Sequence, residues 1–596
     1  MKRRGFLLLL ASLTLGGMSS LSSCKAPENE YNDKSFAYVN LDYDATLMDV
    51  KIKDAKEKYY SGDIISLEIT PKDGYVFAYG LINGEVIKDI TNISLPSGNT
   101  TIKLFAKLLI DNDGITNIRD FTFTQSADKK SYILSSYVPS GKMPEVCEIP
   151  DTYEDKPITE IADAAFTSAS GIKGIKIGKN IEKINSKAFT NCITLTDYSV
   201  SEGNEHFSAS SGALFTKDGS TLLFYAPQHA GEFTIPSGTK TISPYAFSLA
   251  TGLTKINFND DLEEIGEYAF NYCGNLIELN IPSSVKKIGN YAFNTCSLLK
   301  SVTLNEGLTS IGEYAFYKDI KLEKVNIPGS LKEVSQGAFS SCESLTNLSF
   351  AEWVETLGTQ AFSYCLALKE VTLPNTLKTL GTSSFAACDA LTKVTLNEGL
   401  ETISNNVFNV CKLLGDVTLP STVKSIGEDA FGACLSISKF TISDSNANFT
   451  TSLKVGETSY EGILFSKDGS TLIAYPNLYN NRATEFKIPN TVTKIAYRAF
   501  NYTSNNPYVE TTKPYSLVKI FIPSSVKVMD QIVYGANIQE VEYEGTMAEF
   551  KAIKDESGTV TDSDGVTTTL YWYSGSNVKS VKCSDGTITL WRNLKD

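Results

Sequence analysis

Histidine is nearly absent from this sequence, with only His206 and His229 among 596 residues. So few imidazoles weaken any mechanism that needs a histidine general base or a histidine-rich metal site. The sequence also contains no Cys-x-x-Cys pair, no glycine-rich phosphate loop, no His-Glu-x-x-His and no nucleophile elbow. We therefore predict a protein with no catalytic residues, no metal site and no cofactor.

Positively charged residues are also fewer than negatively charged ones. The 54 Lys and Arg residues stand against 68 Asp and Glu, which gives a formal net charge of -14. An acidic chain has no general attraction for a phosphate backbone, so nucleic acid is not an expected partner. With 42% hydrophobic and 20% charged residues, most of the chain should fold. Its length exceeds what one compact core supports, so we expect several domains.

Long apolar runs are confined to the N-terminus. Three basic residues at positions 2–4 precede a leucine-rich stretch over residues 5–17, as in an export signal. The segment Leu21-Ser22-Ser23-Cys24 resembles the lipobox of bacterial lipoproteins, although serine stands where Gly or Ala is commoner before the cysteine. The resemblance implies that residues 1–23 are a lipoprotein signal peptide and that Cys24 is lipidated. An ordinary export signal with a chance cysteine is the alternative.

A lipidated N-terminus would decide where the protein resides. Several acyl chains on one residue would hold it at a membrane surface, since each buried CH₂ contributes about 0.8 kcal/mol. Removing the three basic leader residues would change the net charge from -14 to -17. No other segment is long and apolar enough to span a bilayer, so we expect membrane contact through the N-terminal lipid only. The expected location is the cell surface, on an outer membrane or on the outer face of the plasma membrane. Residues 24–34 are polar and predict a tether.

Residues 35–110 differ from the rest of the chain in their pattern of apolar and polar residues. Apolar and polar side chains alternate in short runs, with Asp-Gly and Asn-Gly turn signals between them, which predicts a small antiparallel β domain. The motifs at Ser61-Gly62-Asp63, residues 71–77 and Asn83-Gly84-Glu85 resemble the small β repeat of internalin-type surface proteins. An immunoglobulin-like domain is the alternative. The resemblance implies a spacer or an accessory binding module.

Phenylalanine recurs with a fixed period along most of the remaining chain. Nine copies follow one another at intervals of 23 residues: Phe247, Phe270, Phe293, Phe316, Phe339, Phe362, Phe385, Phe408 and Phe431. Phe166 and Phe189 are also 23 residues apart, and Phe500 lies three such periods after Phe431. A period of this length over so many copies indicates a solenoid of stacked coils.

One copy of the repeat indicates how a coil is built. Leu279-Asn280-Ile281 alternates inward apolar and outward polar side chains, which predicts a short strand. Pro282 ends that strand because it has no amide hydrogen to donate, and we expect Gly289 to let the chain turn. One coil cannot bury its own apolar face. Stacked coils can, because like residues then lie about 4.8 Å apart in continuous columns.

Motifs such as Ile311-Gly312-x-x-Ala315-Phe316 resemble the BspA-like branch of leucine-rich repeats, and the resemblance covers roughly Phe121 to Ile553. It implies a β-rich solenoid of 23-residue repeats with short parallel strands over residues 111–553, preceded by the small β domain. It also implies a surface-associated bacterial protein that is involved in adhesion to host matrix proteins and other cells.

Two insertions interrupt the coils, near residues 204–232 and 446–485, and both contain the run Lys-Asp-Gly-Ser-Thr-Leu. Asp-Gly between apolar strands predicts a β-hairpin in each of them. The hairpins either contact a ligand or simply widen the solenoid. Residues 554–596 predict a β-rich cap, because the last coil of a solenoid would otherwise expose its apolar columns.

Eight of the 11 cysteines lie three residues after a repeat phenylalanine. Such a ladder could suggest metal binding or serial disulfides. Zinc sites, however, need tight clusters, and parallel Cβ vectors fit a disulfide poorly. We therefore predict a buried column of small side chains. Cys147 and Cys583 lie outside the ladder, and the sequence does not pair them.

The outward strand positions form the candidate binding face. Its members are short polar residues from successive strands, joined by two lysines one position earlier: Asn257, Asn280, Thr303, Asn326, Ser349, Thr372, Thr395, Thr418 and Thr441, with Lys324 and Lys393. This row would present hydroxyls and amides to a protein or a glycan. A merely solvated sheet face is the alternative, since threonine is a good strand former and the row lacks the Trp, Tyr and Arg of protein hot spots.

These observations, together with the resemblance, predict a non-catalytic, monomeric cell-surface binding protein. Its function would be that of an adhesin for a host-matrix protein or another bacterial or host cell, with a glycan as a further possible ligand. The alternative is a structural or carbohydrate-binding surface scaffold. A hydrolase is the remaining alternative, because a catalytic pair of carboxylates is hard to recognise in an acidic sequence. Against it, a regular solenoid offers flat faces rather than a pocket.

Overall fold

The computed structural model describes residues 10–13, 36–45, 47–72, 75–83, 85–87, 89–96, 98–108, 116, 118–139, 143–479, 483–500, 517–533, 538–555, 559–561, 567–569 and 578–590. Several predicted features lie outside these residues: Cys24 and the tether, most of the leader, and the glycines of the two turns at Gly74 and Gly84. Two compact units are distinguished. One comprises residues 1–218, 225–229 and 561–567, and the other comprises residues 219–224, 230–560 and 568–596.

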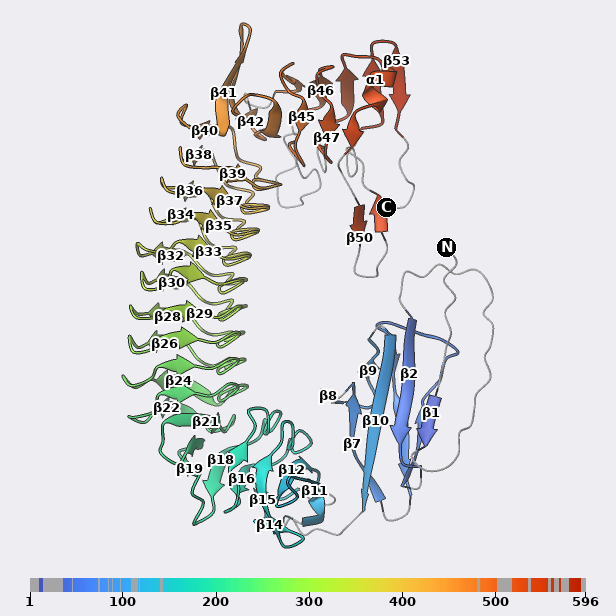
Figure 1. Cartoon of the computed structure of the whole chain (residues 1–596), viewed down its shortest axis with the longest axis vertical. Helices are drawn as coiled ribbons and strands as arrows, with labels where there is room; N and C mark the ends of the chain where they lie inside the picture. The colour runs from blue at the N-terminus through green and yellow to red at the C-terminus, as the bar shows by residue number, and fades with distance from the viewer. Residues whose placement is uncertain are drawn as a thin grey trace. The chain divides into compact units, whose positions relative to one another are not determined.

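The small β domain lies in the first unit and is built on long strands (Figure 1). Its strands are β2 (Phe36–Tyr43), β3 (Met48–Ile52), β4 (Tyr59–Tyr60), β5 (Ile64–Ile65), β6 (Leu67–Pro71), β7 (Tyr75–Ile82), β8 (Glu85–Val86), β9 (Ile93–Ser94) and β10 (Gly98–Leu108), while β1 (Leu10–Leu13) belongs to the leader. Alternate residues such as Val39, Leu41 and Ile102 are buried in its core. The predicted small β domain is thus confirmed.

One pairing in this domain differs from the predicted antiparallel arrangement. Strand β10 pairs antiparallel with β7 but parallel with β2. The reason is topological: β2 and β10 are the first and last strands of the domain, and the whole of the domain forms the crossover between them. Parallel neighbours need such a long connection, whereas a tight turn joins antiparallel strands. The pairs β3–β6, β5–β9 and β2–β4 are antiparallel, and so is the pair β7–β8, which flanks the predicted Asn83-Gly84 turn.

The first unit also contains the first coils. Its elements are η1 (Ile118–Asp120), β11 (Phe121–Gln125), β12 (Tyr132–Tyr137), β13 (Val146–Glu148), β14 (Thr152–Tyr153), β15 (Lys156–Ile161), β16 (Gly174–Ile177), β17 (Lys183–Ile184), β18 (Asp197–Val200), β19 (Phe207–Ser210) and β20 (Ala213–Thr216). Strands β13, β16 and β18 pair in parallel, one coil after the next. The rings of Phe166 and Phe189 lie 5.2 Å apart, and Tyr137 precedes them in the same column at 5.3 Å.

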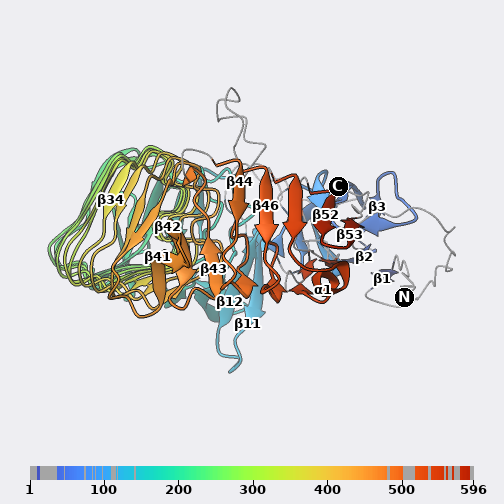
Figure 2. The same cartoon turned by 90° about the horizontal axis from the view of Figure 1, so that it is seen from above.

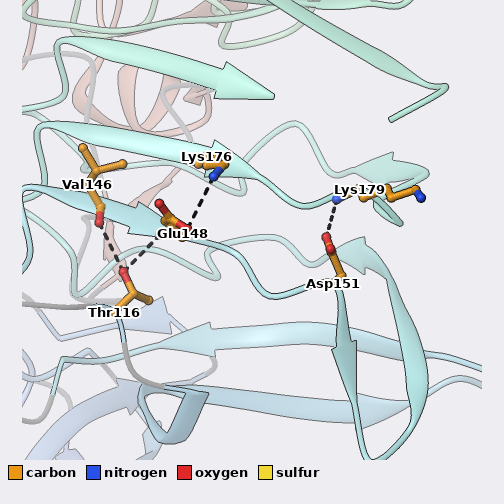
Figure 3. A network of polar contacts seen from close by, with 6 residues as sticks. All are labelled: Thr116, Val146, Glu148, Asp151, Lys176 and Lys179. Atoms are coloured by element: carbon orange, nitrogen blue, oxygen red, sulfur yellow. Dashed lines mark hydrogen bonds and ion pairs between the residues drawn. The ribbon is translucent and has the colours of Figure 1, made fainter. Parts of the chain in front are cut away.

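The side chain of Thr116 covers the outer edge of β13, which is the first strand of this parallel ladder (Figure 3). Its hydroxyl donates to the Val146 carbonyl at 3.2 Å and accepts from the Glu148 amide at 3.0 Å. One coil further on, the Lys176 ammonium reaches the Glu148 carboxylate at 3.5 Å (Figure 3). An uncovered strand edge invites pairing with another chain, so this threonine protects the start of the ladder.

The second unit is a stack of coils with two parallel ladders (Figure 1). The longer strands are β22 (Gly231–Thr234), β24 (Leu253–Asn257), β26 (Glu278–Ile281), β28 (Ser301–Leu304), β30 (Lys324–Ile327), β32 (Asn347–Phe350), β34 (Glu370–Thr372), β36 (Lys393–Thr395), β38 (Val417–Leu419) and β40 (Phe440–Ile442). The shorter ones are β23 (Thr241–Ile242), β25 (Glu264–Ile265), β27 (Lys287–Ile288), β29 (Ser310–Ile311), β31 (Glu333–Val334), β33 (Thr356–Leu357), β35 (Thr379–Leu380), β37 (Thr402–Ile403) and β39 (Ser425–Ile426). Strand β21 (Thr221–Tyr225) precedes them. Seen end-on, these coils lie over one another (Figure 2).

Register in both ladders advances by one repeat. Glu278 pairs with Ser301 and Lys287 with Ser310, each 23 residues further on. The repeat phenylalanines from Phe247 to Phe431 consequently form one column of stacked rings. Their centroids are 4.6 to 5.8 Å apart, with interplanar angles of 14° or less. The predicted solenoid of 23-residue repeats is confirmed.

The cysteines form a second buried column. Each thiol of the ladder donates to the carbonyl oxygen of the phenylalanine 26 residues earlier, at 3.0 to 3.5 Å. All cysteines within the described residues, Cys147 and Cys583 included, are buried free thiols. Burial raises the pKa of the column's thiols other than Cys388, to about 12 at Cys192. At Cys388 burial is outweighed by hydrogen bonds with the Cys365 and Cys411 thiols, which lower its pKa. The thiols with a raised pKa therefore hold neighbouring coils together as neutral hydrogen-bond donors.

The role of Gly289 is different from the predicted one. A Cβ at this position would lie 2.5 Å from the Glu267 amide nitrogen and 2.6 Å from the Gly266 carbonyl carbon of the preceding coil. The glycine is thus required by close approach of two backbones. The chain turns instead at two left-handed residues of the same coil, Tyr291 and Thr295, whose φ angles are 53° and 59°.

The insertion near 446–485 consists of antiparallel strands that rejoin the stack. These are β41 (Phe449–Val455), β42 (Thr458–Ser466) and β43 (Thr471–Ala474), and β43 then pairs in parallel with β45 (Lys494–Ile495). The insertion near 204–232 contains the β19–β20 hairpin. Its strand β21 pairs in parallel with β23, so inserted strands take part in the coil ladder at both sites, as the widening alternative requires.

The chain ends in further strands and a single short helix among the described residues. These are β44 (Glu485–Lys487), β46 (Lys519–Ile522), β47 (Val528–Met529), β48 (Glu540–Tyr543), α1 (Met547–Lys551), β49 (Lys554–Asp555), β50 (Thr559–Thr561), β51 (Thr567–Thr569), β52 (Ser580–Cys583) and β53 (Gly586–Thr589). Strand β52 pairs with β48, and β53 folds back on β52 as a hairpin. This hairpin covers the edge of the last ladder, while residues 571–573 of the predicted cap lie outside the described residues.

Candidate binding surfaces

All eleven side chains of the sequence-predicted binding face lie at outward positions of strands β24 to β40. Asn257 and Thr395 are partly exposed, and the other nine are exposed. Hydrogen bonds link neighbouring coils along the row: the Ser349 hydroxyl donates to the Asn326 amide oxygen at 2.7 Å, and the Asn257 amide donates to the Thr234 hydroxyl at 3.2 Å. The structure thus brings these residues together on one polar face.

A ladder of tyrosines lies in the turns that follow the short strands. Tyr245, Tyr268, Tyr291 and Tyr314 each stand two residues before a repeat phenylalanine, and each is partly exposed. Successive rings stack at 5.0, 4.8 and 5.2 Å with interplanar angles of 9°, 3° and 16°. Burial raises the pKa of Tyr268 and Tyr291, so both hydroxyls stay protonated at neutral pH.

The ladder ends at Gly337, which occupies the tyrosine position in the next coil. A side chain there would overlap the Tyr314 ring, and the Tyr314 hydroxyl instead accepts a hydrogen bond from the Gln336 amide at 2.8 Å. Four rigid rings with hydroxyl edges make an amphipathic strip, which is the chemistry that protein interfaces favour at their centres.

Apolar side chains are also exposed on the turns that follow the phenylalanines. The most exposed of them, at 46 to 54% of their full areas, are Ile193, Tyr272, Ile277, Leu298, Tyr364 and Leu413. They stand at several different positions of the repeat, and singly exposed apolar residues are normal.

The most exposed large hydrophobic residue among those described is Trp353, at 69% of its full area. It lies in the turn after β32, at the end of a strand that carries Ser349 of the polar face. The polar face, whose strand positions contain no aromatic residue, therefore has a tryptophan at its border.

A cavity of about 210 Å³ lies where the insertion interrupts the coils, between the Phe431 and Phe500 repeats. At its wall the Arg498 guanidinium donates to the Asp429 carboxylate at 2.9 Å, and the Asn409 amide donates to the same oxygen at 2.8 Å. The Asp429 side chain is 1% exposed. A buried carboxylate needs such partners, so this ion pair joins the coils on either side of the insertion.

Within the described part of the chain, no three His, Cys, Asp or Glu residues are placed to hold a metal ion together. The described residues also include no helix with the length and apolarity needed to cross a bilayer.

The repeats match the sequence profile of the family described as BspA type leucine-rich repeat region. Six copies match, over residues 87–211, 220–346, 332–453 and 471–553. The chain belongs to this family. No curated protein has a sequence that matches this chain.

Several solved structures resemble this BspA-type solenoid. A leucine-rich cell surface protein from Faecalibacterium prausnitzii is 19% identical over 75% of this chain and 99% of its own, with a TM-score of 0.34. A leucine-rich repeat protein from Eubacterium ventriosum is 25% identical over 56% of this chain and 75% of its own, also at 0.34. A leucine-rich repeat protein from Bacteroides ovatus is 22% identical over 52% of this chain and 95% of its own, with a TM-score of 0.29.

Sequence reasoning missed the tyrosine ladder and the exposed tryptophan. The ladder has a sequence signal, because Tyr-Ala-Phe recurs four times in the 23-residue phase. Trp353 has one too, since it replaces the glycine found at the same position in the coils at Gly307 and Gly399. Both signals lie in turns of the BspA-type repeat, away from the strand positions on which the prediction concentrated.

Proposed function

We propose that this chain is a non-catalytic binding protein of the bacterial cell surface, an adhesin whose partner is a protein of the host matrix or of another cell. The observation that carries this proposal is the tyrosine ladder, a strip of stacked and partly exposed rings. Tyrosine supplies contact area at low conformational cost and is enriched in protein hot spots. Membership of the BspA-type family supports a protein-binding role in general terms.

The alternative is a structural or carbohydrate-binding scaffold, and the polar strand face favours it. That face presents hydroxyls and amides at coil spacing, from Asn257 to Thr441. Two of its members, Ser349 and Asn326, already hydrogen-bond to each other, so a ligand would have to compete with that bond. For this reason the tyrosine ladder is the stronger candidate for the contact surface.

The expected result of replacing two ladder tyrosines is a loss of partner binding. Tyr268→Ser together with Tyr291→Ser should weaken binding to a matrix protein about tenfold or more, because hot-spot aromatics dominate interface energies. Binding is measured by surface plasmon resonance against a panel of purified matrix proteins and, in parallel, on a glycan array. The matched control replaces three residues of the strand face in the same and neighbouring coils, Asn280→Ala, Thr303→Ala and Asn326→Ala.

The control decides between the two surfaces. If the strand-face variant loses binding and the tyrosine variant does not, the contact surface is the polar face. If the protein binds polysaccharides and none of the matrix proteins, the adhesin proposal fails and the scaffold alternative stands.

Anchoring makes a separate prediction. We propose that the chain is exported and that Cys24 carries the lipid, on the basis of the basic leader and Leu21-Ser22-Ser23-Cys24. Cys24→Ser should move the protein from the membrane fraction to the soluble exported fraction, because the lipid is the sole proposed anchor. Fractionation with immunoblotting measures this, and Ser22→Thr is the control that keeps the cysteine. Continued membrane attachment of the serine variant would refute lipid anchoring.

A further inference from the structure

Trp353 occupies a backbone position that two related coils give to glycine. Its φ angle is +86°, and Gly307 and Gly399, two coils away on either side, have φ angles of 110° and 109°. Left-handed backbone costs a residue with a side chain roughly 1–2 kcal/mol. Left-handed tyrosines such as Tyr291 recur in these coils, but Trp353 stands at a position where the related turns have glycine, so the turn itself does not require a side chain there.

The indole does not compensate for this strain by burial. The side chain is 69% exposed, and beneath it lies Gly329, where a Cβ would be 3.3 Å from the Cδ1 atom of the indole. The turn hydrogen bond is also independent of the side chain. The Trp353 amide donates to the Thr376 hydroxyl at 2.9 Å, just as the Gly307 amide donates to the Ser330 hydroxyl at 3.0 Å.

Glu352, the residue before Trp353, accepts fewer hydrogen bonds on its carboxylate than the glutamates at the equivalent position of related coils. Glu306 and Glu398 hold the equivalent position in the two related coils, and each accepts two hydrogen bonds from the following coil. Within the described residues, the Glu352 carboxylate has one such bond, from the Asn375 amide at 3.3 Å. An ionised carboxylate has about four acceptor sites, so Glu352 retains capacity for a further donor.

The neighbouring cations do not neutralise Glu352. Lys332 and Lys378, in the coils on either side, both pair with Glu355 at 3.6 Å. Among the described residues Glu352 forms no ion pair. The chain as a whole carries a net charge of -14, which favours a basic partner.

We propose that Trp353 and Glu352 form a binding site for an arginine side chain of the protein partner. A guanidinium group is planar and can stack on the exposed indole face while its N–H donors bind the carboxylate. An ammonium group lacks the flat, forked geometry that uses both groups at once. This inference rests on the proposed function, since it names the chemistry of the partner at the border of the polar face.

The test uses a small probe and therefore does not depend on finding the partner. Acetyl-arginine amide is titrated into the soluble exported chain (Cys24→Ser), and its neutral analogue acetyl-citrulline amide is titrated in parallel. The readout is the indole N–H signal of Trp353 in a two-dimensional NMR spectrum. The chain has 3 tryptophans, and the Trp353→Gly variant identifies the signal. The arginine probe should shift it saturably and bind about tenfold tighter than the citrulline probe.

Two variants separate binding from a structural role. Glu352→Gln should weaken arginine binding about tenfold and leave the urea unfolding midpoint unchanged, because the residue is exposed. Trp353→Gly should abolish binding while the midpoint stays the same or rises, since glycine is what the related turns contain. Higher ionic strength should weaken the arginine probe but not the citrulline probe.

Three outcomes would overturn the inference. They are equal binding of the citrulline probe, tighter binding of a neutral sugar such as methyl glucoside, and a clear fall in the unfolding midpoint of Trp353→Gly. The two proposals can fail separately. If the parent protein binds a matrix protein and Trp353→Gly binds it equally well, this site is wrong and the adhesin proposal stands. If the arginine probe binds but no protein partner does, this site stands and the adhesin proposal fails.

Discussion

Phe316→Ala is expected to lower the free energy of unfolding by about 3–5 kcal/mol, the range for truncating a fully buried phenylalanine. The Phe316 ring stacks on Phe293 and on Phe339, at 5.1 Å in each case. Its removal takes a stacking partner from both neighbours and leaves a cavity in the middle of the column. Closing that cavity would require two coils to approach more closely, which their paired backbones prevent. Urea unfolding followed by circular dichroism measures the loss.

Ile320→Ala is the matched control, because this residue lies in the same coil but is 37% exposed. Its loss should stay below about 1 kcal/mol. A double-mutant cycle adds a test of the column itself: Phe316→Ala and Phe408→Ala should be additive, whereas Phe316→Ala and Phe339→Ala should show coupling. A loss for Phe316→Ala no larger than that for Ile320→Ala would show that the column does not support the stack.

The 23-residue phase was sufficient to predict the solenoid, because in a repeat protein every contact between coils is a contact between like positions. The inward column at Phe293, the exposed side chain at Asn280 and the burial of Cys296 all follow from that rule. The polar face could be predicted for the same reason, since alternation along a strand settles which side chains point outward.

The features that escaped prediction are those in which a coil departs from its neighbours or in which distant segments meet. The contact between Asp429 and Arg498 joins residues 69 positions apart, which is three periods, so both hold the same position of the repeat. The phase alone did not show that the coils on either side of the insertion lie close enough for this ion pair. The role of Gly289 depends on how closely the preceding coil approaches it, since an added Cβ would lie 2.5 Å from the Glu267 amide nitrogen, rather than on its own φ angle. Trp353 was overlooked because a periodic pattern emphasises residues that repeat. Trp353 departs from the repeat, and that departure is what makes it a candidate functional residue.

Asp319 is another departure of this kind, and its replacement should stabilise the protein. It occupies a cysteine position in the buried column, between Cys296 and Cys342. One carboxyl oxygen accepts from the Cys296 amide at 2.7 Å, and the other has no partner among the described residues. Asp319→Cys should therefore raise the free energy of unfolding by about 1–3 kcal/mol, the cost of a buried polar group left unpaired. The new thiol could donate to the Phe293 carbonyl, as the Cys342 thiol does to that of Phe316.

The stabilisation should also depend on pH, and urea unfolding at several pH values measures it. Burial raises the pKa of Asp319 well above its ordinary value of 3.8, so the folded protein keeps a proton that the unfolded chain releases. Unfolded protein then binds fewer protons than folded protein, and stability falls as the pH rises from 3.8 towards the folded-state pKa. The slope approaches about 1.4 kcal/mol per pH unit. The gain from Asp319→Cys should thus be smallest at about pH 4, where the unpaired oxygen alone contributes, and larger at neutral pH.

Asp319→Asn separates titration from hydrogen bonding. It should remove the pH-dependent part of the difference while keeping a buried polar side chain in the column, so its gain should be smaller than that of the cysteine variant. Carboxylates with a lowered pKa have the opposite effect on the pH dependence of stability. One is Glu306, whose pKa is lowered by hydrogen bonds from the Gly329 and Ser330 amides. Comparing each variant with the parent at the same pH cancels those contributions. A gain that is equal at about pH 4 and about pH 7 would mean that Asp319 does not hold a proton in the folded state.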